Sequence, residues 1–118
     1  YHLRWSSEWV IRLGDGTEES KSRMEKAIDE LWMFTGEMFE AADYEKEMMN
    51  SGIGVNPETI RENWEKKVEE VFAEATLTVP PKKAWHQTGG KNGIHTENLG
   101  YILAEMQYLQ RVYPGAEW

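Results

Sequence analysis

The chain has 118 residues and no cysteine, which suits one domain with a modest core and excludes a disulfide framework, a thiolate metal site and a cysteine nucleophile. Its net charge of -8 argues against nucleic-acid binding, because phosphate contacts draw on clustered lysine and arginine. No apolar run is long enough to span a bilayer, so we expect a cytoplasmic protein without a nucleic-acid or membrane partner.

The first predicted helix covers residues 1–13. Trp5, Trp9 and Leu13 recur every four residues, which is typical of the apolar stripe of an amphipathic helix. The Gly-Asp-Gly sequence at 14–16 ends this helix, since glycine and aspartate favour helix ends and turns. The opening residues read as the middle of a helix, with no capping residue before them. We therefore expect a fragment of a longer protein.

The second predicted helix begins with Asp15 as N-cap and Glu18 at capping-box spacing. It continues to Phe39, because one glycine at 36 weakens a helix without necessarily ending it. A short extra helix is expected over 43–50. The apolar stripe of the second helix consists of Met24, Ala27, Ile28, Leu31, Trp32, Thr35, Met38 and Phe39.

The third predicted helix begins at Asn56 and Pro57, an N-cap followed by the proline that is common at the first helical position. Residues 77–95 contain two adjacent prolines and a glycine-rich stretch, which predicts a long loop. The residues expected to face inward on the third helix are Ile60, Trp64, Val68, Val71, Phe72 and Ala75.

The last predicted helix has Thr96 as N-cap and ends before Pro114. No segment shows the alternation of a strand, so the fold class is predicted to be all-α, with a bundle architecture and one helical domain over 1–118. The residues expected to be buried on the last helix are Leu99, Ile102, Leu103, Met106 and Leu109.

A di-iron site in a helical bundle requires Glu-x-x-His on two helices, so that both ligands leave the same helical face. None of His2, His86 and His95 follows a glutamate at that spacing. We therefore predict no metal ligand and no catalytic residue in this chain. His95 and Glu97 fit a structural place at the start of the last helix, where a carboxylate stabilises the first turn.

The remaining candidate sites concern binding. Lys82, Lys83 and Lys91 form the only local basic cluster of an acidic chain, and they are weak candidates for contacts with a coenzyme A phosphate, although a solvated loop explains them more simply. Tryptophans on helical stripes either pack in a core or bind a partner. The candidate partner-binding residues are Trp5, Trp9, Trp32, Trp64, His95 and Glu97.

Four segments resemble one family. They are residues 1–4 (YHLR), 9–20 (WVIRLGDGTEES), 89–91 (GGK) and the helix 99–111 with the Pro-Gly sequence at 114–115. Together they resemble the PaaC-type subunit of bacterial phenylacetyl-CoA epoxidase, a multicomponent monooxygenase that oxidises an aromatic ring. The motifs occur in order over nearly all of the chain and correspond to the C-terminal half of that family.

The resemblance implies the C-terminal helices of a ferritin-like bundle. It also implies a non-catalytic structural subunit of aerobic phenylacetate degradation, which pairs with a PaaA-type catalytic subunit that holds the di-iron centre, and with other subunits of the complex. Two alternatives stay open: a di-iron oxygenase subunit with ligands in upstream helices, and a helical module that binds acyl-CoA. Self-association is a further option.

Overall fold

The computed structural model describes residues 1–81 and 85–117. The chain divides into two compact units, Tyr1–Thr88 and Gly89–Trp118. The described residues form helices, turns and loops, without a strand, so the predicted all-α fold class is confirmed. Among the described residues, no helix has the length and apolar character needed to cross a bilayer. The single domain over 1–118 stays a prediction.

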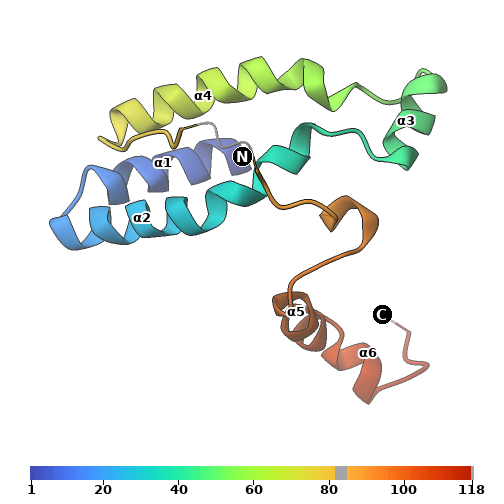
Figure 1. The fold of residues 1–118 in the computed structure, drawn as a ribbon. Coiled ribbons are helices and arrows are strands. Elements are labelled where there is room, and N and C mark those ends of the chain that lie inside the picture. The colour runs from blue at the N-terminus through green and yellow to red at the C-terminus, as the bar shows by residue number, and fades with distance from the viewer. Residues whose placement is uncertain (82–84, 118) are drawn as a thin grey trace. The chain divides into compact units, whose positions relative to one another are not determined.

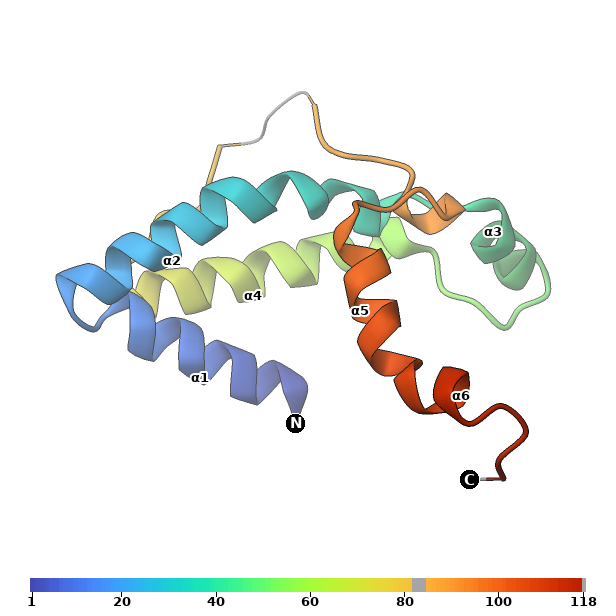
Figure 2. The same cartoon turned by 90° about the horizontal axis from the view of Figure 1, so that it is seen from below.

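The first unit is built on three long helices, and α1 contacts both α2 and α4 (Figure 1). They are α1 (His2–Gly14), α2 (Glu18–Leu31) and α4 (Arg61–Glu74). The elements between α2 and α4 are the 3₁₀ turns η1 (Trp32–Phe34) and η2 (Gly36–Phe39), α3 (Asp43–Asn50) and η3 (Pro57–Ile60). Figure 2 shows α3 beyond the end at which α4 begins. The predicted helix over 43–50 is confirmed.

The connection between α1 and α2 corrects one predicted cap. Asp15 belongs to the end of α1, where its N–H donates to the Ile11 carbonyl at 2.9 Å. Thr17 is the N-cap of α2, since its hydroxyl oxygen accepts from the Ser20 N–H at 3.2 Å. The predicted capping box of Asp15 with Glu18 is therefore wrong. Asp15 continues the last turn of α1 and cannot also open the next helix.

The α-helical part of α2 is shorter than predicted. It ends at Leu31, and the chain continues to Phe39 in 3₁₀ turns. The Thr35 hydroxyl donates to the Trp32 carbonyl at 2.8 Å, and the Thr35 N–H bonds the same carbonyl at 3.1 Å. These bonds to the third residue back tighten the helix at this point.

The predicted start of the third helix is confirmed at its cap. The Asn56 side chain accepts from the Glu58 N–H at 3.1 Å, and Pro57 follows at the first position of η3. The inward stripe is confirmed only in part. Val71 and Ala75 are buried, whereas Ile60 is 50% exposed because it lies in η3, before α4 begins.

The core of the first unit is small, and it extends from the first turn of α4, where Phe39 contacts Trp64, to the C-terminal end of this helix. The buried apolar residues are Phe39, Val71, Ala75 and Leu77. Thr76 follows Ala75 with a left-handed backbone (φ 56°), and the Leu77 N–H bonds the Phe72 carbonyl at 2.9 Å. This pattern closes α4 and turns Leu77 into the core.

The second unit contains the short turn η4 and two short helices. They are η4 (Gly90–Asn92), α5 (Asn98–Met106) and α6 (Tyr108–Val112). Glu97, not Thr96, stands at the N-cap of α5, and the helix breaks at Gln107. Outside these elements the described part of 77–95 lacks regular structure, as the predicted loop requires.

The burial predicted for the last helix is wrong within this unit. Ile102, Met106 and Leu109 are 53%, 70% and 49% exposed, and only Leu99 and Leu103 are half-buried. A helix of nine residues followed by one of five offers no second layer against which the whole stripe can be buried.

Candidate functional site

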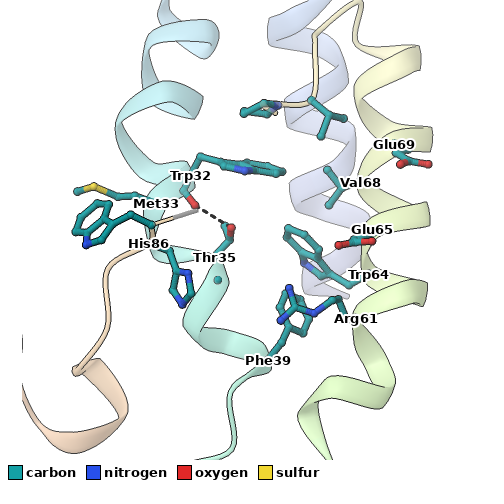
Figure 3. Close-up of a pocket in the computed structure, with 14 residues that line it drawn as sticks. Trp32, Met33, Thr35, Phe39, Arg61, Trp64, Glu65, Val68, Glu69 and His86 are labelled. Carbon is teal, nitrogen blue, oxygen red and sulfur yellow. Dashed lines mark hydrogen bonds between the residues drawn. The ribbon is translucent and has the colours of Figure 1, made fainter. Parts of the chain in front are cut away.

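A pocket of about 260 Å³ opens in the first unit between the 3₁₀ turns after α2, the helix α4 and the residue pairs 79–80 and 85–86 (Figure 3). Its walls are mainly apolar and aromatic. The described residues that line it are Trp32, Met33, Thr35, Gly36, Phe39, Arg61, Trp64, Glu65, Val68, Glu69, Val79, Pro80, Trp85 and His86.

The aromatic rings of the pocket contact one another across three elements, η1, η2 and α4. The ring of Trp64 on α4 lies 5.8 Å from that of Trp32 and 5.2 Å from that of Phe39, centroid to centroid. Both pairs are tilted or edge-on, which is the arrangement that ring quadrupoles favour. Figure 3 shows Trp32 and Trp64 approaching the pocket from opposite sides. These contacts join the 3₁₀ turns to α4.

Arg61 forms the end of the pocket next to Phe39. Its guanidinium carbon lies 4.6 Å from the centre of the Phe39 ring, a cation–π contact. The same guanidinium donates two hydrogen bonds of 3.0 Å to the two oxygens of Glu58. Because this bidentate pair compensates its charge, Arg61 acts as a wall of the pocket more than as an anchor for an anion.

His86 lies on the opposite side of the pocket and is held from two directions. Its Nε2 is 2.6 Å from Oε1 of Glu40, and the N–H of Gln87 donates to the Met33 carbonyl at 2.9 Å. A Cβ on Gly36 would lie 2.6 Å from His86 Cδ2, so only glycine leaves room for the ring at this position. From the sequence, His86 was considered only as a metal ligand, and its spacing excluded that role.

Two of the predicted partner-binding tryptophans, Trp32 and Trp64, meet in this pocket and are half-buried there. Trp85 and the role of His86 were not predicted, because both residues come from a segment without periodicity. The only signal for them was an aromatic residue and a histidine in a long loop. The assignment of Trp32 and Trp64 to partner binding stays a prediction.

Trp5 and Trp9 lie elsewhere, on the exposed side of α1, where they are 53% and 46% exposed. The ring of Trp5 stacks on Tyr1 at 6.2 Å and meets Trp9 edge-on at 6.4 Å. We call Tyr1, Trp5 and Trp9 the aromatic ladder. The apolar residues of α1 that are half-buried are Val10 and Ile11, and Gly14 is buried.

The stripe of Trp5, Trp9 and Leu13 is therefore not the face of α1 that packs in the first unit, and its assignment to partner binding stays a prediction. The helix carries apolar residues on two faces, and the smaller face packs on α2 and α4. Gly14 allows close approach at the end of that face, whereas the indole rings of the other face are too bulky for it.

The other predicted sites belong to the second unit or fall outside the described residues. Lys82 and Lys83 lie outside them, so the predicted basic cluster is not observed as a group. Lys91 lies in η4. His95 and Glu97 are exposed, and Glu97 makes no side-chain cap at the start of α5 within the described part of the chain. Their assignment to partner binding stays a prediction.

Within residues 1–81 and 85–117, no three histidine, aspartate or glutamate side chains are grouped so that they could hold a metal ion. Beside the pocket, His86 and Glu40 form a pair, which is fewer than the ligands of a di-iron centre. The described residues therefore do not fit a di-iron centre.

Similarity to known proteins extends over the whole chain. Residues 1–118 match the family described as phenylacetic acid catabolic protein. The chain is 52% identical, over 118 residues, to the C subunit of the 1,2-phenylacetyl-CoA epoxidase of Escherichia coli (strain K12). The match covers 100% of this chain and 47% of that protein, so the chain spans about half the length of this relative.

Proposed function

The chain belongs to the phenylacetic acid catabolic protein family, and on that basis we propose that it acts as a non-catalytic structural and interaction subunit of a phenylacetyl-CoA epoxidase. Its proposed partners are a PaaA-type subunit, which holds the di-iron centre, and further subunits of the same cytoplasmic complex. In this proposal the chain itself binds no iron. The support is the 52% identity to the C subunit of such an enzyme and the exposed aromatic surface of α1.

The observation that carries the proposal is the aromatic ladder on α1. The opposite side of this helix already packs on α2 and α4, so the stability of the first unit does not account for exposed rings at Trp5 and Trp9. Exposed tryptophan and tyrosine side chains in one row are typical of the centre of a protein interface. The ladder therefore suits contact with another subunit.

The second unit also exposes large apolar side chains. Tyr101, Ile102 and Met106 of α5 are 70%, 53% and 70% exposed. Large apolar surfaces of this kind mark interaction sites in soluble proteins. The apolar surface of the chain thus exceeds what its small core uses, which fits a subunit that is completed by partners.

Co-expression with a PaaA-type subunit tests the proposal. We expect the two proteins to co-elute in size-exclusion chromatography, with iron only in the partner. The double variant Trp5→Ser/Trp9→Ser should weaken the complex by at least about tenfold, because central aromatic residues dominate interface energies. Ile53→Ser, at an exposed loop position, is the matched control and should leave the complex intact.

The circular dichroism spectrum of the isolated double variant should match that of the wild type, because both tryptophans are exposed. A failure of the wild-type proteins to associate would contradict the proposal, as would full binding by the double variant. Iron in this subunit would instead favour the di-iron alternative.

A further inference from the structure

We propose that Asn92 is a site of spontaneous deamidation, in which the backbone nitrogen of Gly93 attacks the side-chain amide of Asn92. The two residues lie in the second unit, at the end of the short turn η4. The reaction needs no partner subunit, so this modification goes beyond the assembly function proposed above.

The reaction is an intramolecular acyl transfer whose only co-reactant is water. The Gly93 nitrogen forms a bond to Cγ of Asn92, and the side-chain nitrogen leaves as ammonia with the proton of the Gly93 N–H. Water then opens the resulting five-membered succinimide at one of its two carbonyl groups. The product is aspartate or isoaspartate, and in isoaspartate the main chain runs through the former side chain. Either product adds a negative charge to the second unit.

The space around Gly93 favours this attack. Glycine has no Cβ that would obstruct the approach of its nitrogen to the preceding side chain. Apart from its chain neighbours, no atom of the described residues lies within 4 Å of the place where a Cβ on Gly93 would stand. Asn92 is exposed, so water can reach the succinimide. The attacking nitrogen and the amide it attacks are therefore both accessible.

A hydrogen bond of η4 holds the attacking nitrogen in the folded chain. The N–H of Gly93 donates to the Gly90 carbonyl at 3.1 Å, and the N–H of Ile94 donates to the Gly89 carbonyl at 2.9 Å. The hydrogen bonds of a 3₁₀ turn have poor geometry, and exposed turns open at little cost in free energy. We therefore expect the turn to slow the reaction relative to the unfolded chain without preventing it.

The other pair of this kind is Asp15 and Gly16, and its surroundings differ. A Cβ on Gly16 would lie 2.7 Å from the Arg12 carbonyl oxygen and from Ser20 Oγ, so this glycine is closely packed. The carboxylate of an ionised aspartate is also a poorer electrophile than an amide. Each of the remaining asparagines is followed by a residue with a side chain, and these asparagines are Asn50, Asn56, Asn63 and Asn98.

The test incubates the 118-residue chain at mildly alkaline pH and follows its peptides by mass spectrometry. We expect the amide of Asn92 to be lost at least about tenfold faster than that of Asn50, an exposed asparagine at the end of α3. The loss should accelerate as the pH rises, because the attacking nitrogen must lose its proton. An unchanged amide at Asn92 would overturn the proposal, as would equal rates at Asn92 and Asn50.

Two variants and an unfolded sample locate the reaction. A protein isoaspartate methyltransferase with labelled S-adenosylmethionine measures the isoaspartate formed. Asn92→Gln keeps a side-chain amide but would need a six-membered ring, so it should abolish most of the label. Asn50→Gln is the matched control and should leave the label unchanged. Wild-type labelling of Asn92→Gln would overturn the proposal, as would labelling of the wild type only when guanidinium chloride unfolds it.

Discussion

Gly14 at the end of α1 lies directly against Ala75 at the end of α4. A Cβ on Gly14 would stand 2.5 Å from the Ala75 carbonyl oxygen and 2.9 Å from the Ala75 Cβ. Ala75 is fully buried, and the hydroxyl of the next residue, Thr76, donates to the Gly14 carbonyl at 3.3 Å. The two helices therefore meet backbone to backbone, at the place where the core of the first unit is formed.

Gly14→Ala should destabilise the first unit by about 1–3 kcal/mol, because the added methyl overlaps the Ala75 backbone and cannot be relieved by a side-chain rotation. The better helix propensity of alanine, worth about 1 kcal/mol, offsets only part of this cost. Urea denaturation followed by circular dichroism measures the change.

Gly100→Ala is the matched control. Gly100 lies within α5, and apart from its chain neighbours and the backbone of its own helix, no atom of the described residues stands within 4 Å of the position of its Cβ. Alanine there should raise the helicity of α5 and should not destabilise the chain. If Gly14→Ala were as stable as Gly100→Ala, the close contact between Gly14 and Ala75 would be absent in solution.

Because Val71 is buried and Met106 is exposed, replacement by aspartate should destabilise the chain strongly at Val71 and hardly at all at Met106. Val71→Asp should cost roughly 3–5 kcal/mol, because it places a carboxylate in the core without a partner. Met106→Asp should change stability by no more than about 0.5 kcal/mol, since Met106 is 70% exposed. Thermal denaturation of both variants measures the difference. A large loss in Met106→Asp would show that this residue is buried in solution, as its place on the apolar stripe predicts.

The sequence predicted the elements better than it predicted which of their faces are buried. Helix ends at Gly14, Asn56 and Pro57 follow local rules of capping and backbone freedom, and these rules need no tertiary information. On α1 the sequence left open whether the tryptophan stripe packs in a core or binds a partner, because two different sets of residues on this helix are apolar, one containing the tryptophans and the other containing Val10 and Ile11. Periodicity reports that a face is apolar, but not which neighbour covers it.

The pocket shows a second limit of what can be predicted from the sequence. Trp32 and Trp64 stood out in the sequence as residues at helical spacing. Trp85 and His86 reach the same pocket from a loop, whose path depends on tertiary contacts such as that of His86 with Glu40. The close approach of His86 to the glycine at 36 joins two distant parts of the chain, and no local pattern encodes it.

Gly36→Ala should displace the His86 ring and break its contact with Glu40, because a Cβ there would overlap the ring. We expect a loss of about 1–2 kcal/mol of stability and a change in the NMR signals of the His86 imidazole. His86→Ala removes the ring and should make the further change Gly36→Ala nearly neutral. If Gly36→Ala lowered the stability equally in the wild type and in the His86→Ala variant, the contact between Gly36 and His86 would be absent in solution.

The pair of Arg4 and Glu8 predicts a response to pH. Arg4 Nε donates to Glu8 Oε1 at 2.9 Å, and this hydrogen bond, reinforced by the positive charge of Arg4, lowers the pKa of Glu8 below its ordinary value of 4.5. A carboxyl group with a lowered pKa in the folded chain stabilises the fold above its unfolded pKa. That contribution is lost as the pH falls through the lower, folded pKa.

Arg4→Gln should raise the pKa of Glu8 towards its ordinary value, which NMR titration of the Glu8 carboxyl group measures directly. Arg12→Gln is the matched control, because Arg12 also lowers the pKa of Glu8, but as the weakest of the causes. We therefore expect a smaller upward change in Arg12→Gln than in Arg4→Gln. Equal changes in the two variants would mean that general positive charge on α1, and not the hydrogen bond from Arg4, controls the titration of Glu8.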